Sequence, residues 1–162
     1  MRRHKRRPEQ KKKKITKWQL IIPVILGGAG VGIGLVVNLA VAGPPPLQQC
    51  IPTENMAFHL HTKINVSLNG EPFIVPADIG VTPSCVKPLH THDTDGVIHT
   101  EFHKPIRFTL GGFIKLWGFD LNQYDFKIFA KGTDDPAFTE VTDYNALSLD
   151  DNLEIKIELT GR

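Results

Sequence analysis

The sequence predicts a small α+β domain in which one short helix packs on a mainly antiparallel sheet, in the manner of a β-grasp, preceded by one transmembrane helix. Three observations predict it: strand pairs marked by Asn69-Gly70 and Asp95-Gly96, an amphipathic segment at 110–117, and an apolar run at 20–42. A small β-sandwich is the alternative arrangement of the same strands.

The transmembrane helix is predicted at residues 18–42. Residues 20–42 carry no charged side chain, and about 23 residues at roughly 1.5 Å each span the hydrocarbon of a bilayer. The alternative is a cleaved signal peptide, because Ala40-Val41-Ala42 precedes Gly43 in the small-x-small form that a signal peptidase accepts. Signal peptides have apolar regions of about 7–15 residues, so the longer run favours a retained anchor.

Residues 1–17 form a basic tail with ten Lys and Arg against the single acid Glu9. By the positive-inside rule this tail is cytoplasmic, so the protein is predicted to be a single-pass protein of the cell membrane with its C-terminal domain outside. After residue 42 there are nine Lys and Arg and sixteen Asp and Glu, a formal charge of about −7. That charge argues against nucleic acid as the partner of the exterior domain.

Four glycines of the anchor give two overlapping G-x-x-x-G spacings, which let a second membrane helix approach closely: Gly28, Gly30, Gly32 and Gly34. The predicted partners are therefore the lipid bilayer and, through these glycines, another membrane helix or complex. Residues 43–49 follow as a Pro-rich stalk, with Pro44-Pro45-Pro46 favouring an extended chain. The exterior α+β domain is predicted at 50–162.

The first strand of that domain is predicted at 58–68, where polar and apolar residues alternate. His59 and His61 share its polar face. Asn69-Gly70 then favours a tight hairpin turn, and residues 71–76 supply the return strand.

The segment 90–101 predicts a second hairpin, with Asp95-Gly96 as a two-residue turn. In that register His92 lies opposite His99 and His90 lies opposite Glu101. Because side chains alternate faces along a strand, all four project from one side of the sheet.

The remaining elements follow from periodicity and caps. Thr109 can cap a helix over 110–117, and Gly118 can end it. Alternating residues predict strands at 124–130 and 153–159, and residues 132–143 are predicted to form a surface loop.

Cys50 and Cys85 are the only cysteines, and both follow the predicted anchor. Outside the cytoplasm a disulfide between them is the default expectation. The alternative makes Cys85 a thiolate ligand, since its spacing to His90 is similar to a blue-copper site, but no methionine follows to serve as the usual axial ligand.

The histidine-rich face predicts a metal site whose candidate ligands are His90, His92, His99, His59, His61 and Glu101. Imidazole with carboxylate suits a transition metal; intrinsic affinity favours copper, and zinc is a second choice. The alternative is a polar or pH-responsive sheet face that binds nothing. No His-Glu-x-x-His, serine nucleophile or nucleotide-binding motif is present, so no catalytic or cofactor-binding residue is assigned and an enzyme is not the favoured hypothesis.

Eight motifs occur in a fixed order over residues 50–118. They are His59-Leu60-His61, Asn69-Gly70, Val75-Pro76-Ala77-Asp78-Ile79-Gly80, Cys85, His90-Thr91-His92-Asp93, Gly96-Val97-Ile98-His99-Thr100-Glu101, Phe108-Thr109-Leu110-Gly111 and Trp117-Gly118. In this order and spacing the chain resembles a family of uncharacterised, membrane-anchored exterior proteins of prokaryotes. The resemblance implies an exterior domain with a histidine-rich face. It implies no particular activity, because the family has none established. The chain departs from the family's pattern at Gly112 and after Tyr124.

The sequence thus predicts a membrane-anchored exterior domain that binds a transition metal, copper before zinc, for sequestration or delivery. A first alternative is a non-catalytic accessory subunit docked through its transmembrane helix to a larger complex. A second alternative is a small metalloenzyme.

Overall fold

The computed structural model of the chain describes residues 44–52 and 56–162, and residues 44–162 form one compact unit. The predicted basic tail and transmembrane helix, including the glycines of the helix, lie outside the described residues. No helix within these residues is long and apolar enough to cross a membrane.

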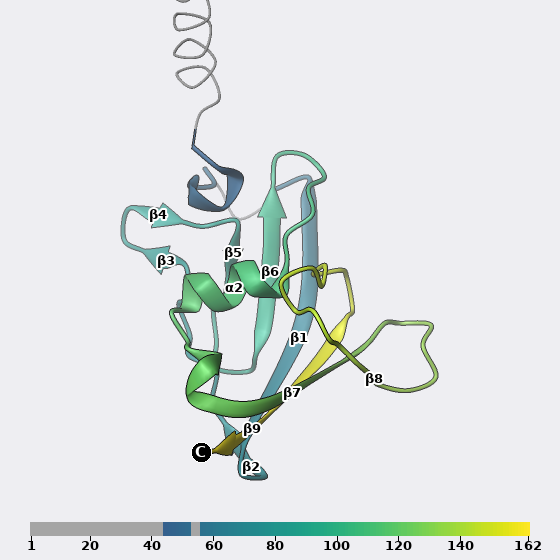
Figure 1. Cartoon of the computed structure of the whole chain (residues 1–162). Coiled ribbons are helices and arrows are strands. Elements are labelled where there is room, and N and C mark those ends of the chain that lie inside the picture. Colours follow the sequence, from purple (N-terminus) through teal and green to yellow (C-terminus); the bar gives the residue numbers. More distant parts are fainter. Residues whose placement is uncertain (1–43, 53–55) are drawn as a thin grey trace, which may run out of the picture. The chain divides into compact units, whose positions relative to one another are not determined.

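A mainly antiparallel, seven-stranded sheet and one α-helix make up this unit, which confirms a small α+β domain. Six strands lie in the order β5-β6-β1-β9-β7-β8, and β2 also pairs with β1 (Figure 1). The strands of the sheet are β1 (Phe58–Leu68), β2 (Glu71–Phe73), β5 (Leu89–His90), β6 (Val97–Phe102), β7 (Tyr124–Lys131), β8 (Thr139–Glu140) and β9 (Glu154–Gly161). A separate ribbon consists of β3 (Val81–Thr82) and β4 (Cys85–Val86).

The strand β1 forms over the residues that the alternating pattern predicts, 58–68, and it has partners along both edges. It pairs in parallel with β9 over 63–68 and antiparallel with β6 over 58–63. The antiparallel pair of β9 with β7 extends the sheet. The alternating side chains of β1 place Ile64 and Val66 in the core and leave His59 and His61 exposed on the opposite face.

The Asn69-Gly70 hairpin is confirmed. Both residues have positive φ angles, 52° and 87°, which is typical of a type I′ turn, and Leu68 pairs with Glu71 across a two-residue loop. The return strand is shorter than predicted and ends at Phe73.

The predicted turn at Asp95-Gly96 is wrong, and with it the register of the second strand pair. His90 pairs with His99, and residues 91–96 form the connecting loop. The Asp95 carboxylate accepts a hydrogen bond from the Val97 N–H at 2.9 Å, and the Gly96 carbonyl accepts one from the Ile64 N–H at 2.8 Å. A two-residue hairpin would need the Val97 N–H to bond to the Thr94 carbonyl, but the Asp95 side chain takes that N–H instead, and the Gly96 carbonyl is bonded to β1.

This register differs from the predicted one by two residues, because His90 replaces His92 opposite His99. Side chains alternate faces with a period of two, so an even shift keeps each side chain of a strand on its predicted face. A shift by one residue would have moved His99 to the core side.

The helix α2 (Leu110–Trp117) has the predicted bounds and caps. The Thr109 hydroxyl accepts a hydrogen bond from the Gly112 N–H at 3.2 Å, and Gly118 ends the helix in the left-handed conformation. Leu110, Phe113 and Ile114 are buried in the same core as the apolar residues of the sheet. Most of the predicted loop at 132–143 is irregular, and only β8 forms within it.

The disulfide between Cys50 and Cys85 is present, with Cα atoms 5.2 Å apart, so Cys85 is not a thiolate ligand. Ahead of it, Pro46–Gln48 form one 3₁₀ turn where the sequence predicted an extended stalk. The side chain of Leu47 packs against the core, and Lys87 donates a hydrogen bond to the Gln48 carbonyl at 2.7 Å. These contacts favour a turn over an extended chain.

We expect Gly96→Ala to lower the free energy of unfolding more than Gly70→Ala does. Both glycines have positive φ angles, so each substitution costs about 1–2 kcal/mol of backbone strain. At Gly96 the added methyl group would also overlap the Ile64 carbonyl oxygen, whereas at Gly70 it would meet open space. Urea unfolding of the two variants measures the difference, and equal losses would contradict the close approach of this loop to β1.

Candidate metal centre

Three histidines form one row across three neighbouring strands. His61 of β1 lies opposite His99 of β6, and His99 lies opposite His90 of β5. In the adjacent row His59 lies opposite Glu101. The pairing of β1 with β6 therefore brings together side chains that are about 40 residues apart in the sequence.

Five of the six predicted ligands are histidines that fall into two groups of three. The groups are His59, His61 and His99, and His90, His92 and His99, and in each the ligand atoms lie within 4.8 Å of one another. His99 belongs to both. The two groups could each hold a metal ion.

His90 is fully buried, and its contacts fix which ring nitrogen is available. Its Nδ1 lies 2.9 Å from the Lys87 carbonyl oxygen. A carbonyl only accepts, so Nδ1 carries the proton and Nε2 of the neutral ring has the lone pair. That Nε2 lies 3.1 Å from Nε2 of His92. A ring that donates one N–H to a carbonyl and presents its other nitrogen is the usual form of a metal-bound histidine.

Two rings of the cluster are neutral near pH 7. Burial lowers the pKa of His90 from 6.5 to about 4, and repulsion from His92 and His59 adds to this effect. Burial also lowers the pKa of His99 to about 4, with repulsion from neighbouring histidines as the second cause. Because a metal ion competes with protons for imidazole, these low pKa values favour metal binding.

Glu101 is 1% exposed and places a carboxylate beside the exposed edge of the cluster. Its Oε1 lies 3.1 Å from Nε2 of His59, and the same Nε2 lies 3.3 Å from Nδ1 of His99. Glu101 belongs to neither group of three, and its carboxylate can offset the charge of a cation bound beside His59. His103, the next residue of this parity along the chain, is exposed and packs on Phe102, outside both groups.

Thr91 fixes the two histidines beside it, a role that the sequence analysis missed. Its hydroxyl donates to the Pro76 carbonyl at 2.9 Å and accepts from the Ile79 N–H at 3.0 Å. Its backbone N–H donates to the Ile79 carbonyl, and its carbonyl accepts from the Asp78 N–H. Thr91 is fully buried, so these four bonds hold His90 and His92 in place although His92 follows the end of β5.

No local pattern marks Thr91, because a threonine inside a His-x-His motif is unremarkable on any strand. The carbonyl of Lys87 is equally hard to find, since every residue has one. Both contacts depend on how the segments 76–79 and 87–92 pack together.

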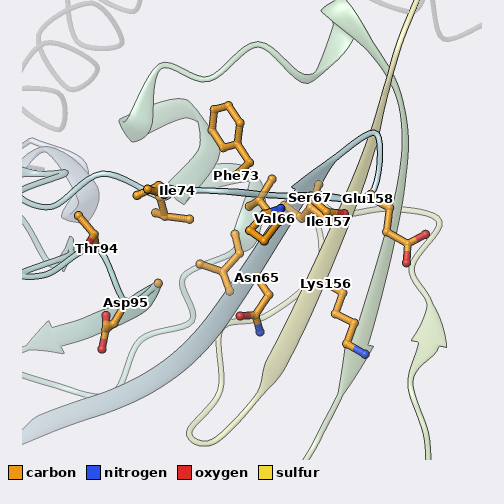
Figure 2. A pocket seen from close by; sticks show the side chains of 15 residues that line it. Asn65, Val66, Ser67, Phe73, Ile74, Thr94, Asp95, Lys156, Ile157 and Glu158 are labelled. Carbon is orange, nitrogen blue, oxygen red and sulfur yellow. The ribbon is translucent and has the colours of Figure 1, made fainter.

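A cleft of about 410 Å³ lies elsewhere on the domain, where the β2 and β6 partners of β1 separate. Asn65 and Lys156 line one part of it and Thr94 and Asp95 another (Figure 2). Ile74 also lines the cleft and is 69% exposed. None of the six predicted ligands lines this cleft. The histidine cluster is thus a separate feature of the surface.

Comparison of the chain with protein-family models, with curated proteins and with solved structures finds no match.

The arrangement offers neutral nitrogen ligands, a buried carboxylate nearby and a partly exposed approach. Such a set suits zinc, copper, nickel or iron, and the ligands alone do not select among them. Because His59 and His61 are exposed, an ion held there can exchange with the surroundings.

We expect Thr91→Val to lower the free energy of unfolding by about 1–3 kcal/mol, since the buried Ile79 N–H loses its partner while the side-chain shape is kept. Urea unfolding measures this. Thr160→Val, at an exposed strand position, serves as the control with an expected change below about 0.5 kcal/mol. Equal effects of the two substitutions would show that the Thr91 hydroxyl does not hold this loop.

The metal-free protein should lose stability as the pH falls from about 6.5 to about 4. In this window the unfolded chain binds protons at His90 and His99 that the folded chain does not bind. Above this window both imidazoles are neutral in the folded and in the unfolded chain, so they no longer change the stability. The buried His90 accounts for up to about 3 kcal/mol, and the partly exposed His99 contributes less because of solvent screening. Urea unfolding of chelator-treated protein at several pH values, compared with His90→Gln, should show a shallower pH dependence in the variant.

Proposed function

We propose that this protein is a membrane-anchored exterior domain that binds a transition metal ion, copper before zinc, for sequestration or delivery. The observation that carries the proposal is the group His90, His92 and His99. Its ligand atoms lie close together, one ring is fully buried, and the rings of His90 and His99 are neutral near pH 7.

The buried position of His90 distinguishes this group from a polar sheet face. A buried imidazole needs partners for both nitrogens. One is paired with a backbone carbonyl, and the other points at a second histidine instead of at a backbone or carboxylate group. An ion between His90 and His92 would use the lone pairs of both.

Copper is preferred because nitrogen ligands alone are unselective, and intrinsic affinity for such sites is highest for Cu(II) among the divalent first-row metals. The acidic character of the domain, about −7 after residue 42, favours the approach of a cation. Partial exposure of the cluster supports sequestration or delivery, since a partner can reach the ion.

The anchor is proposed from the sequence. The uncharged run at 20–42 and the basic residues before it support a single span with the tail in the cytoplasm. The C-terminal domain then lies outside, where a disulfide such as Cys50–Cys85 is stable.

We also propose that the strands β2-β1-β9-β7-β8 form a β-grasp arrangement. A hairpin at the beginning, a helix between, and a last strand parallel to the first support it. The strands β5 and β6, which carry His90 and His99, are then an addition beside β1.

The full chain, extracted from membranes in detergent and stripped with a chelator, should retain copper after dialysis against copper sulfate. His92→Ala/His99→Ala should abolish this retention, because it removes two of the three ligands of the group that carries the proposal. Elemental mass spectrometry measures the retained metal.

His103→Ala is the matched control, since His103 is an exposed histidine of the same domain outside both groups. It should retain as much metal as the unaltered chain. Equal retention by the double variant would refute the site, and recovery of the chain in the soluble fraction without detergent would contradict the anchor.

A further inference from the structure

We propose that the histidine cluster holds two metal ions, one in each group of three, with His99 as a ligand shared by both. This inference rests on the proposed function and specifies the number of metal positions at the same site.

The first observation that supports two ions is the distance between the two nitrogens in each of two histidine pairs. Two nitrogens bound to one ion at about 2.0–2.1 Å lie about 2.9–3.4 Å apart for angles between about 90° and 110°. Nε2 of His90 and Nε2 of His92 are 3.1 Å apart, and Nε2 of His59 and Nδ1 of His99 are 3.3 Å apart. One pair belongs to each group, so each group already contains two ligands at the spacing that a single ion requires.

The second support is the central place of His99. Its ring lies 4.7 Å from that of His61 and 4.6 Å from that of His92, measured between ring centroids. His59 and His61 form a group with His99, as do His90 and His92, but the two pairs do not join in one group of five. One ion therefore cannot use all five rings where they stand, and each position needs His99 to reach three ligands.

An imidazole can serve two ions at once because it has two ring nitrogens. Nδ1 of His99 faces His59, and in the proposed centre Nε2 of His99 would bind the ion of the other group. Binding of the second ion requires the neutral ring to lose its remaining N–H proton to solvent. Each ion gains a bond to one nitrogen and releases a bound water, and no oxidation state changes.

The charges near His99 favour such a centre. Two divalent cations on one ring repel each other, and the imidazolate would carry one compensating negative charge. The carboxylate of Glu101, 3.1 Å from His59 and almost fully buried, supplies a second.

The test uses the full chain in detergent, stripped with a chelator and then titrated with copper sulfate alone. We expect it to retain about two equivalents of copper, one for each group. His61→Ala and His92→Ala, which each remove a ligand from one group only, should each retain about one equivalent. His99→Ala removes a direct ligand from both groups and should weaken both positions by at least the roughly 10-fold that loss of an outer-shell partner costs, and His103→Ala should match the unaltered chain.

Electron paramagnetic resonance tests whether His99 is shared. Two Cu(II) ions on one imidazolate are magnetically coupled, so the signal of the fully loaded chain should account for far less than its total copper. His92→Ala, with a single ion, should give a signal that accounts for all of its copper.

The outcomes separate this inference from the proposed function. A plateau at about one equivalent would leave metal binding intact and overturn the second position. Two equivalents with full, uncoupled signal would overturn the sharing of His99. No retained copper would overturn both proposals.

Discussion

The antiparallel pairing of β1 with β6 is the contact on which the histidine cluster depends. It sets His59 opposite Glu101 and His61 opposite His99, while the other faces of the same strands supply Ile64 and Ile98 to the core. A slip of one residue would bury the histidines and expose the core residues. The hydrophobic effect that holds the core thus also fixes the place of the ligands.

Burial distinguishes the two sides of the cluster. His90 is fully buried, whereas His59 and His61 remain open to solvent. Burial lowers the pKa of His90 and His99, and the Lys87 carbonyl determines which nitrogen of His90 stays available. A site of this kind has one rigid, neutral side that is ready to bind and one accessible side through which an ion can enter or leave.

Several elements could be predicted from local patterns because their causes are local. The strict alternation in β1, the Thr109 and Gly118 caps of α2, and the positive φ angles at Asn69-Gly70 each depend on a few neighbouring residues. The Asp95-Gly96 turn was misjudged because its geometry depends on β1, whose Ile64 N–H bonds to the Gly96 carbonyl. The predicted faces of β5 and β6 survived that error because the register shifted by two residues.

The sequence by itself determined the features that do not depend on how the strands pair. These are the residues that alternate, the two ends of the helix, the possibility of a disulfide, and the recurrence of histidines on polar strand faces. Only the tertiary structure decided that two His-x-His segments meet on one face around His99. It also decided that Thr91 and the Lys87 carbonyl hold the buried side, because hydrogen bonds between distant segments leave no periodic trace in a sequence. The geometry of a shared ligand is a property of three strands in register, and no single strand encodes it.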